Sequence, residues 1–73
     1  MQTASVEVVS RGRRFQVLAM ESEAQTRTIG VIPLQKGGRD DLEIVYTEKS
    51  KSGEPLEVCM MRCARRWMAS RAK

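Results

Sequence analysis

The chain contains no histidine and no asparagine, and only three of its residues are aromatic. Histidine is the side chain used most often for proton transfer near neutral pH and for binding transition metals. A nucleophilic cysteine would therefore lack its usual base. Sequence patterns for phosphate-binding loops, nucleophile elbows and calcium loops are missing too. We predict a protein that is not an enzyme, with no catalytic residue and no cofactor.

Cysteine is also scarce, since Cys59 and Cys63 are the only two. At this C-x3-C spacing they would share one face of a helix, where side chains are poorly aimed for a disulfide. A zinc site usually takes four ligands, and the sequence offers two thiols. We therefore predict two small buried core residues and no metal site.

Long apolar runs are absent, and no stretch approaches the roughly 20 residues that cross a bilayer. The first residues, MQTASVEVVSRGRR, lack the apolar segment of a secretory signal peptide. The composition, with 41% hydrophobic and 30% charged residues in a chain of 73, is typical of one small globular domain. We therefore expect a single cytoplasmic domain spanning 1–73, with no membrane partner.

Residues 1–50 have the pattern of β-structure. Apolar and β-branched residues predict strands at 4–10, 15–22, 28–34 and 42–50. The sequence RGRR at 11–14 predicts a basic hairpin turn, because Gly12 can adopt a positive φ. Pro33 removes a backbone donor, so the third strand either lies at an edge or ends there. The sequence QKGGRDD at 35–41 predicts a further turn.

The strand at 42–50 alternates most regularly of the four. Successive side chains of a strand point to opposite faces, so we expect two sets of residues on different faces. These sets are Leu42, Ile44 and Tyr46 on one face, and Glu43, Val45 and Thr47 on the other.

Residues 54–73 predict a basic amphipathic helix, with Glu54 as N-cap and Pro55 as the first helical residue. On a helical wheel Arg62, Arg65 and Arg66 lie opposite an apolar arc. That arc consists of Leu56, Cys59, Met60, Cys63 and Trp67. A second interpretation makes 56–60 a fifth strand, because the segment LEVCM also alternates, and begins the helix only at Arg62.

These elements together predict an α+β fold, in which a small antiparallel sheet of about four strands is covered on one face by the C-terminal helix. Trp67 is the expected anchor of the core beneath that helix. Met61 and Met68 lie at the margin of the apolar arc and suit an adaptable binding surface.

Positive charge is concentrated at the C-terminal end of the chain. The last 15 residues include five basic and no acidic side chains, whereas the first 58 include eight basic and nine acidic ones. The predicted hairpin turn is a second basic point. This pattern predicts an acidic macromolecular partner. The residues expected to bind it are Arg11, Arg13, Arg14, Arg62, Arg65 and Arg66.

Three interpretations of the arginines stay open: a solvated surface, docking on an acidic protein, and a grip on nucleic acid. Helix-turn-helix, zinc-finger and RNP-type aromatic patterns are missing from the sequence. We therefore prefer a protein partner, with a DNA- or RNA-binding repressor as the alternative. The expected oligomeric state is a monomer or a weak homodimer.

The segments MQTASVEVVSRGRRFQVLAMES and MRCARRWMASRAK, with the size and layout of the chain, resemble small phage-encoded regulators that bind bacterial RNA polymerase. The resemblance implies a non-enzymatic protein that contacts the largest polymerase subunit in the host cytoplasm. It further implies inhibition of transcription initiation, through weaker promoter engagement by the σ-containing holoenzyme, and antitermination. The resemblance assigns no binding residue, so the arginines above rest on the charge pattern alone.

Overall fold

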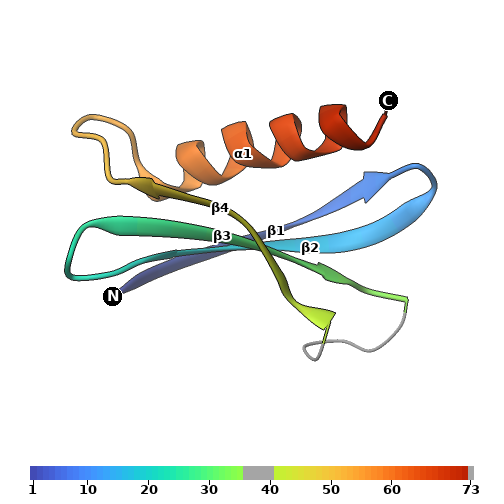
Figure 1. Cartoon of the computed structure of the whole chain (residues 1–73), viewed down its shortest axis with the longest axis horizontal. Coiled ribbons are helices and arrows are strands. Elements are labelled where there is room, and N and C mark those ends of the chain that lie inside the picture. The colour runs from blue at the N-terminus through green and yellow to red at the C-terminus, as the bar shows by residue number, and fades with distance from the viewer. Residues whose placement is uncertain (36–40, 73) are drawn as a thin grey trace.

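The computed structural model describes residues 1–35 and 41–72. In this part of the chain a four-stranded antiparallel sheet carries a C-terminal helix on one face (Figure 1). The strands lie in the sheet in their sequence order, and the elements are β1 (Gln2–Ser10), β2 (Arg13–Glu21), β3 (Thr26–Pro33), β4 (Glu43–Lys49) and α1 (Leu56–Arg71). The predicted α+β fold, with four strands and a C-terminal helix, is confirmed.

The hairpin between β1 and β2 is tighter than the sequence suggested. Ser10 pairs with Arg13, so that Arg11 and Gly12 alone form the turn. Their φ angles are 55° and 78°, as the two-residue turn that matches the twist of a hairpin requires. Arg13 and Arg14 therefore belong to β2, and the prediction that this strand begins at residue 15 is wrong.

Pro33 is the last residue of β3, which lies inside the sheet between β2 and β4. Of the two roles predicted for this proline, ending the strand is therefore the correct one. The turn predicted at 35–41 lies mostly outside the described residues.

A bulge between β3 and β4 changes the faces predicted for the fourth strand. Ile29 pairs with Tyr46, but the next residue, Gly30, pairs with Ile44. Because the bulge adds one residue to β4, Tyr46 faces the helix while Ile44 lies on the outer face of the sheet. The prediction that Ile44 and Tyr46 share a face is therefore wrong. A Cβ atom at Gly30 would lie 2.7 Å from Leu42 Cδ1, so the glycine makes room for Leu42.

The long-helix prediction is confirmed, because α1 runs from Leu56, and the alternative of a fifth strand at 56–60 is wrong. The helix begins slightly later than expected. Pro55 is the N-cap residue, with extended backbone angles and no side-chain cap. Glu54 therefore precedes the N-cap position, and its carboxylate pairs with Arg62. Within the described residues, no helix is both long enough and apolar enough to cross a membrane.

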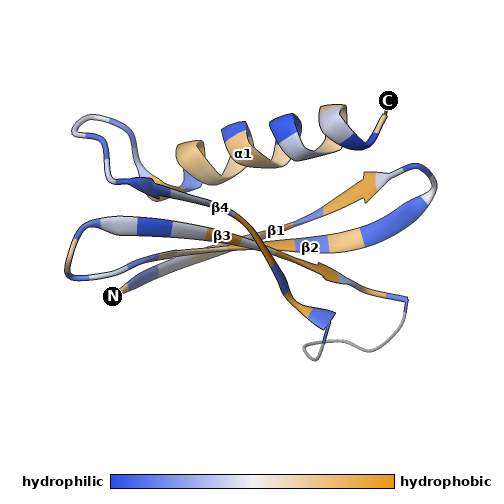
Figure 2. Ribbon diagram, viewed as in Figure 1, coloured by the Kyte–Doolittle hydropathy of each residue, from blue (hydrophilic) through white to orange (hydrophobic). Residues whose placement is uncertain are grey.

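The core lies between α1 and the sheet face that the helix covers, and Figure 2 shows apolar residues concentrated in the middle of the strands. Val17 and Ile29 contribute its largest fully buried aliphatic side chains. Both cysteines are buried, as predicted. Trp67 is half-buried at the edge of this core. The core cluster consists of Phe15, Val17, Ala19, Ile29, Val31, Leu56, Cys59, Met60, Cys63 and Ala64.

Candidate interaction surface

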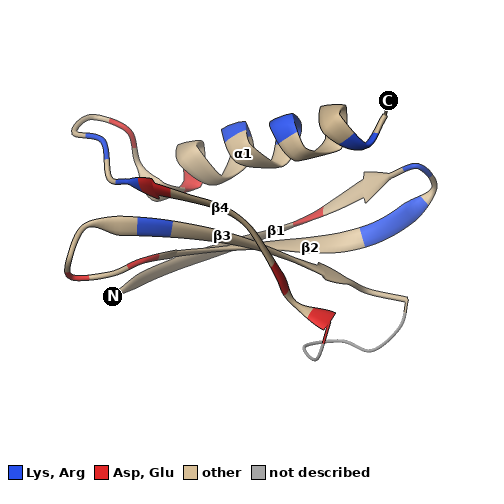
Figure 3. Cartoon of the chain, in the orientation of Figure 1, with Lys and Arg blue, Asp and Glu red and all other residues tan. Residues whose placement is uncertain are grey.

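The β1–β2 hairpin turn meets the C-terminal end of α1, although about 60 residues of sequence separate them. Arg11 Nη1 donates a hydrogen bond to the backbone oxygen of Arg71 at 3.2 Å, and Arg71 Nε donates to Ser10 Oγ at 3.1 Å. Figure 3 shows the basic residues of the hairpin and those near the helix end on the same side of the molecule. The fold thus places the basic hairpin turn next to the basic C-terminal end of α1, although the two are far apart in the sequence.

Two aromatic rings hold Arg71 in place. Phe15 and Trp67 pack edge to face, with ring centroids 5.0 Å apart and planes at 79°. The Arg71 Cζ atom lies 4.8 Å from the Phe15 centroid and 4.9 Å from the Trp67 centroid. A guanidinium at this distance is attracted to the negative faces of aromatic rings. We call Arg11, Arg13, Phe15, Trp67 and Arg71 the hairpin–helix cluster.

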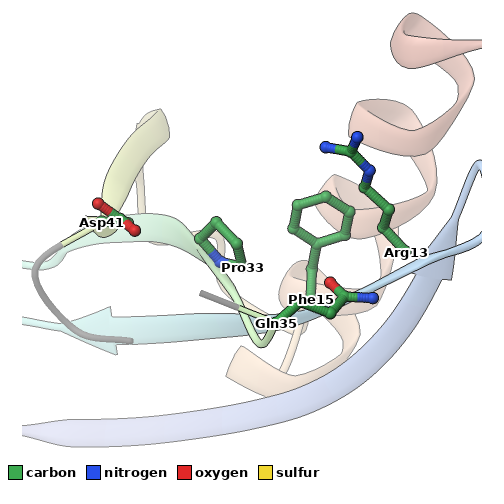
Figure 4. A pocket seen from close by; sticks show the side chains of 5 residues that line it. All are labelled: Arg13, Phe15, Pro33, Gln35 and Asp41. Atoms are coloured by element: carbon green, nitrogen blue, oxygen red, sulfur yellow. The ribbon is translucent and has the colours of Figure 1, made fainter. Parts of the chain in front are cut away.

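A cavity of about 410 Å³ lies beside this cluster and shares Arg13 and Phe15 with it. Figure 4 shows the Arg13 guanidinium near the Phe15 ring and the Asp41 carboxylate at the other end of the cavity, with Pro33 between them. Among the described residues, the lining combines the cation of Arg13 and the anion of Asp41 with the apolar Phe15 and Pro33 and the amide of Gln35. Such a lining suits a side chain of a protein partner better than a uniformly anionic ligand.

The outer side of α1 continues the exposed basic surface. Arg65 and Arg66 are both exposed, and Arg66 Cζ lies 5.2 Å above the Tyr46 ring of β4. Two apolar side chains are exposed on the same helix: Val58 with 52% and Met61 with 38% of its surface accessible. Exposed apolar groups beside cations are typical of a surface that binds another macromolecule.

The opposite end of the molecule is charged as well, but its two arginines, Arg27 and Arg62, are paired with glutamates. Arg62 forms ion pairs with Glu48 of β4 and with Glu54, which precedes α1. Its Nε donates to Glu54 Oε2 at 3.1 Å, and its Nη2 donates to Glu48 Oε1. Arg62 therefore tethers the first half of α1 to the sheet.

Arg27 of β3 extends this pairing into the interior. Its side chain is 6% exposed, and its Nη2 donates to the backbone oxygen of Glu54 at 2.7 Å. Its Nε lies 3.4 Å from a Glu21 carboxylate oxygen, and its Nη1 lies 3.8 Å from one of Glu54. Among the described residues these two nitrogens have no hydrogen-bond partner, so the attraction is electrostatic only. We call Glu21, Arg27, Glu48, Glu54 and Arg62 the ion-pair network.

The network shifts the titration of two of its carboxylates. The hydrogen bonds that Arg62 donates lower the pKa of Glu48 and of Glu54 below their ordinary values. A lowered pKa means that the folded protein favours the charged carboxylates. The network is therefore a stabilising element whose strength depends on pH.

The six arginines predicted to bind a partner fall into different environments. Arg11 and Arg13 lie in the hairpin–helix cluster, and Arg65 and Arg66 are exposed on α1. Arg14 follows Arg13 in β2 and so points to the outer face of the sheet, where it pairs with Glu7 at 3.6 Å. The sixth, Arg62, lies in the ion-pair network. The structure thus brings two of the six together, beside Arg71.

Sequence reasoning missed the ion-pair network and the stacking of Arg71. Glu21, Arg27, Glu48 and Glu54 come from separate strands and a loop, and no local pattern links them. The strongest available signal was a lone arginine, Arg27, within the apolar strand TRTIGVIP, since an arginine in a buried strand requires an acidic partner.

Comparison of the chain with protein-family models, with curated proteins and with solved structures gives no match.

Proposed function

We propose that this protein is a non-enzymatic regulator that binds an acidic surface of a macromolecule in the bacterial cytoplasm. The partner we propose is the largest subunit of bacterial RNA polymerase, with inhibition of transcription initiation, accompanied by antitermination, as the consequence. The choice of RNA polymerase as the partner rests on the resemblance to small phage-encoded regulators. The acidic surface is supported by one observation, namely that Arg11, Arg13 and Arg71 gather at one end of the molecule.

Arg71 is well prepared for binding, because two rings and a serine hydroxyl fix its side chain before a partner arrives. Ordering a long arginine side chain on binding costs roughly 0.5–1.5 kcal/mol, and this side chain is already ordered. Long-range attraction by the neighbouring arginines would speed the encounter, while Val58 and Met61 would supply apolar contact. The mechanism we propose is occlusion of a surface on the polymerase, with no chemical step.

The test is binding of the purified full-length protein to bacterial RNA polymerase core and holoenzyme, measured by biolayer interferometry at several salt concentrations. Charge reversal in the double variant R11E/R13E should weaken binding at least about tenfold, since rows of like charge across an interface repel by several kcal/mol. The double variant R65E/R66E should also weaken binding.

The matched control is R14E, which reverses a charge in the same hairpin but on the opposite face of the sheet. We expect R14E to bind within about twofold of the original chain, because its side chain lies outside the proposed contact and its charge is screened by solvent. Equal losses of polymerase affinity in R14E and R11E/R13E would contradict the proposal that the face carrying Arg11 and Arg13 binds the polymerase. Unchanged binding in both double variants, or no binding to the polymerase at all, would remove the proposal. Binding of DNA or RNA alone, with a steep salt dependence, would favour the repressor alternative.

A further inference from the structure

Three potential metal ligands converge between β4 and the first half of α1. They are the Sγ atoms of Cys59 and Cys63 and a carboxylate oxygen of Glu48, and among the described residues these atoms lie within 4.8 Å of one another. The cysteines are 0% and 1% exposed, and Glu48 is half-buried. The sequence showed two thiols, and the fold adds the carboxylate from a different element.

The spacing of these atoms suits tetrahedral zinc. Zinc binds thiolate sulfur at about 2.3 Å and carboxylate oxygen at about 2.0–2.2 Å, which puts the two sulfurs about 3.8 Å apart and sulfur about 3.5 Å from oxygen. Cys59 Sγ lies 3.4 Å from Glu48 Oε1, which is already close to that separation. Cys63 is one helical turn from Cys59 on the same face, so small side-chain rotations bring its sulfur into range.

The charges around the group also fit a divalent cation. Two thiolates and one carboxylate carry three negative charges, one more than zinc neutralises. Arg62, which also pairs with Glu54, lies beside the excess negative charge, since its Nη2 donates to Glu48 Oε1 and lies 3.6 Å from Cys59 Sγ. Hydrogen bonds of this kind hold metal ligands in position in many metalloproteins.

We propose that Cys59, Cys63 and Glu48 form a zinc site that ties α1 to β4, with water in the fourth position. The site is separate from the partner-binding surface, and its success or failure leaves the proposed function untouched. A thiol must lose its proton before its sulfur can bind a metal ion. Binding breaks two S–H bonds, forms two S–Zn bonds and releases two protons to solvent, so affinity rises with pH.

The experiment uses Co²⁺ as a spectroscopic probe for zinc. The reduced full-length protein is refolded in oxygen-free buffer with one equivalent of Co²⁺, and its absorption spectrum is recorded. We expect a thiolate-to-cobalt charge-transfer band with the intensity of two thiolates, together with the visible bands of tetrahedral cobalt. One equivalent of Zn²⁺ should abolish these bands and raise the melting temperature, whereas Mg²⁺ should do neither. Absence of the charge-transfer band from the original chain overturns the proposal.

Three variants identify the ligands. C59S and C63S should each remove about half or more of the charge-transfer intensity, because each takes away one thiolate. E48Q should keep both thiolates but bind cobalt at least about tenfold more weakly. The matched control is E43Q, which changes an exposed carboxylate of the same strand and should bind like the original chain. Equal cobalt affinity in E48Q and E43Q would exclude Glu48 as a ligand and contradict the three-ligand site. If a serine variant does not fold, the spectrum of the original chain still decides whether the thiols bind metal.

Discussion

The two ends of this small sheet carry arginines in opposite circumstances. At the end where α1 begins, Arg27 and Arg62 are surrounded by three glutamates. At the end where α1 finishes, Arg11 and Arg71 contact each other's chain segments. Arg71 packs on two aromatic rings, and within residues 1–35 and 41–72 it forms no ion pair with a carboxylate. The first arrangement satisfies charge inside the protein, whereas the second leaves charge available to a partner.

The comparison shows that counting basic residues along a sequence does not identify a binding surface. Arg62, Arg65 and Arg66 are near neighbours in sequence and on a helical wheel, yet Arg62 alone lies within reach of Glu48 and Glu54. An ion pair of this kind consumes the hydrogen-bonding capacity of a guanidinium. Whether an arginine remains free to bind a partner therefore depends on which acidic side chains the fold places beside it.

Replacement of Arg27 should have the largest effect on stability. The variant R27M leaves Glu21 and Glu54 without their interior cation, and removal of one partner from a buried pair typically costs about 3 kcal/mol. Urea unfolding followed by circular dichroism measures the change, with R14M as an exposed control expected to differ from the original chain by about 0.5 kcal/mol or less. Equal unfolding midpoints for R27M and R14M would show that the network does not stabilise the fold.

Removal of Arg71 should have a smaller effect. The variant R71A loses contact with two aromatic rings and the hydrogen bond to Ser10, which together are worth about 1–2 kcal/mol. The exposed helix residue Arg65 provides the control, because R65A removes the same charge without those contacts. If R71A and R65A unfold at the same urea concentration, the hairpin–helix cluster does not hold the two segments together.

Acid should reduce the contribution of the ion-pair network to the stability of the fold. The pKa values of Glu48 and Glu54 are lowered in the folded state, so their contribution is complete above the unfolded pKa of about 4.3 and is lost as pH falls through the lowered values. We therefore expect the urea midpoint to fall between pH 5 and pH 3 by more in the original chain than in E48Q. The two midpoints at each pH give the measurement, and parallel curves would contradict this role for Glu48.

The smallest effect on stability is expected from the double variant R11E/R13E. Both side chains are exposed, and the hydrogen bond from Arg11 to Arg71 lies at the surface. The free energy of unfolding should therefore change by about 0.5 kcal/mol or less, even though we expect the same variant to lose partner binding. A large loss of stability in R11E/R13E would mean that the hairpin arginines hold the fold together, and the contrast between the two ends would disappear.

Local pattern was sufficient for most of the secondary structure. Alternation located four strands, and the apolar arc from Leu56 to Trp67 located the helix, because both depend on short-range periodicity. The faces predicted for the fourth strand were wrong because they depend on its pairing with a neighbouring strand. The bulge opposite Ile29 and Gly30 depends on the pairing of β3 with β4, and no property of residues 42–50 alone reveals it.

The sequence by itself determined the elements, their order and the identity of the buried helix face, since these follow from the spacing of apolar residues along the chain. The tertiary structure alone decided which charges are paired and which are exposed. It also decided that Glu48 joins Cys59 and Cys63, and that Arg11 joins Arg71. The physical reason is distance: hydrogen-bonded ion pairs and ligand contacts form only between atoms a few ångströms apart, and only folding brings residues so far apart in sequence within that range.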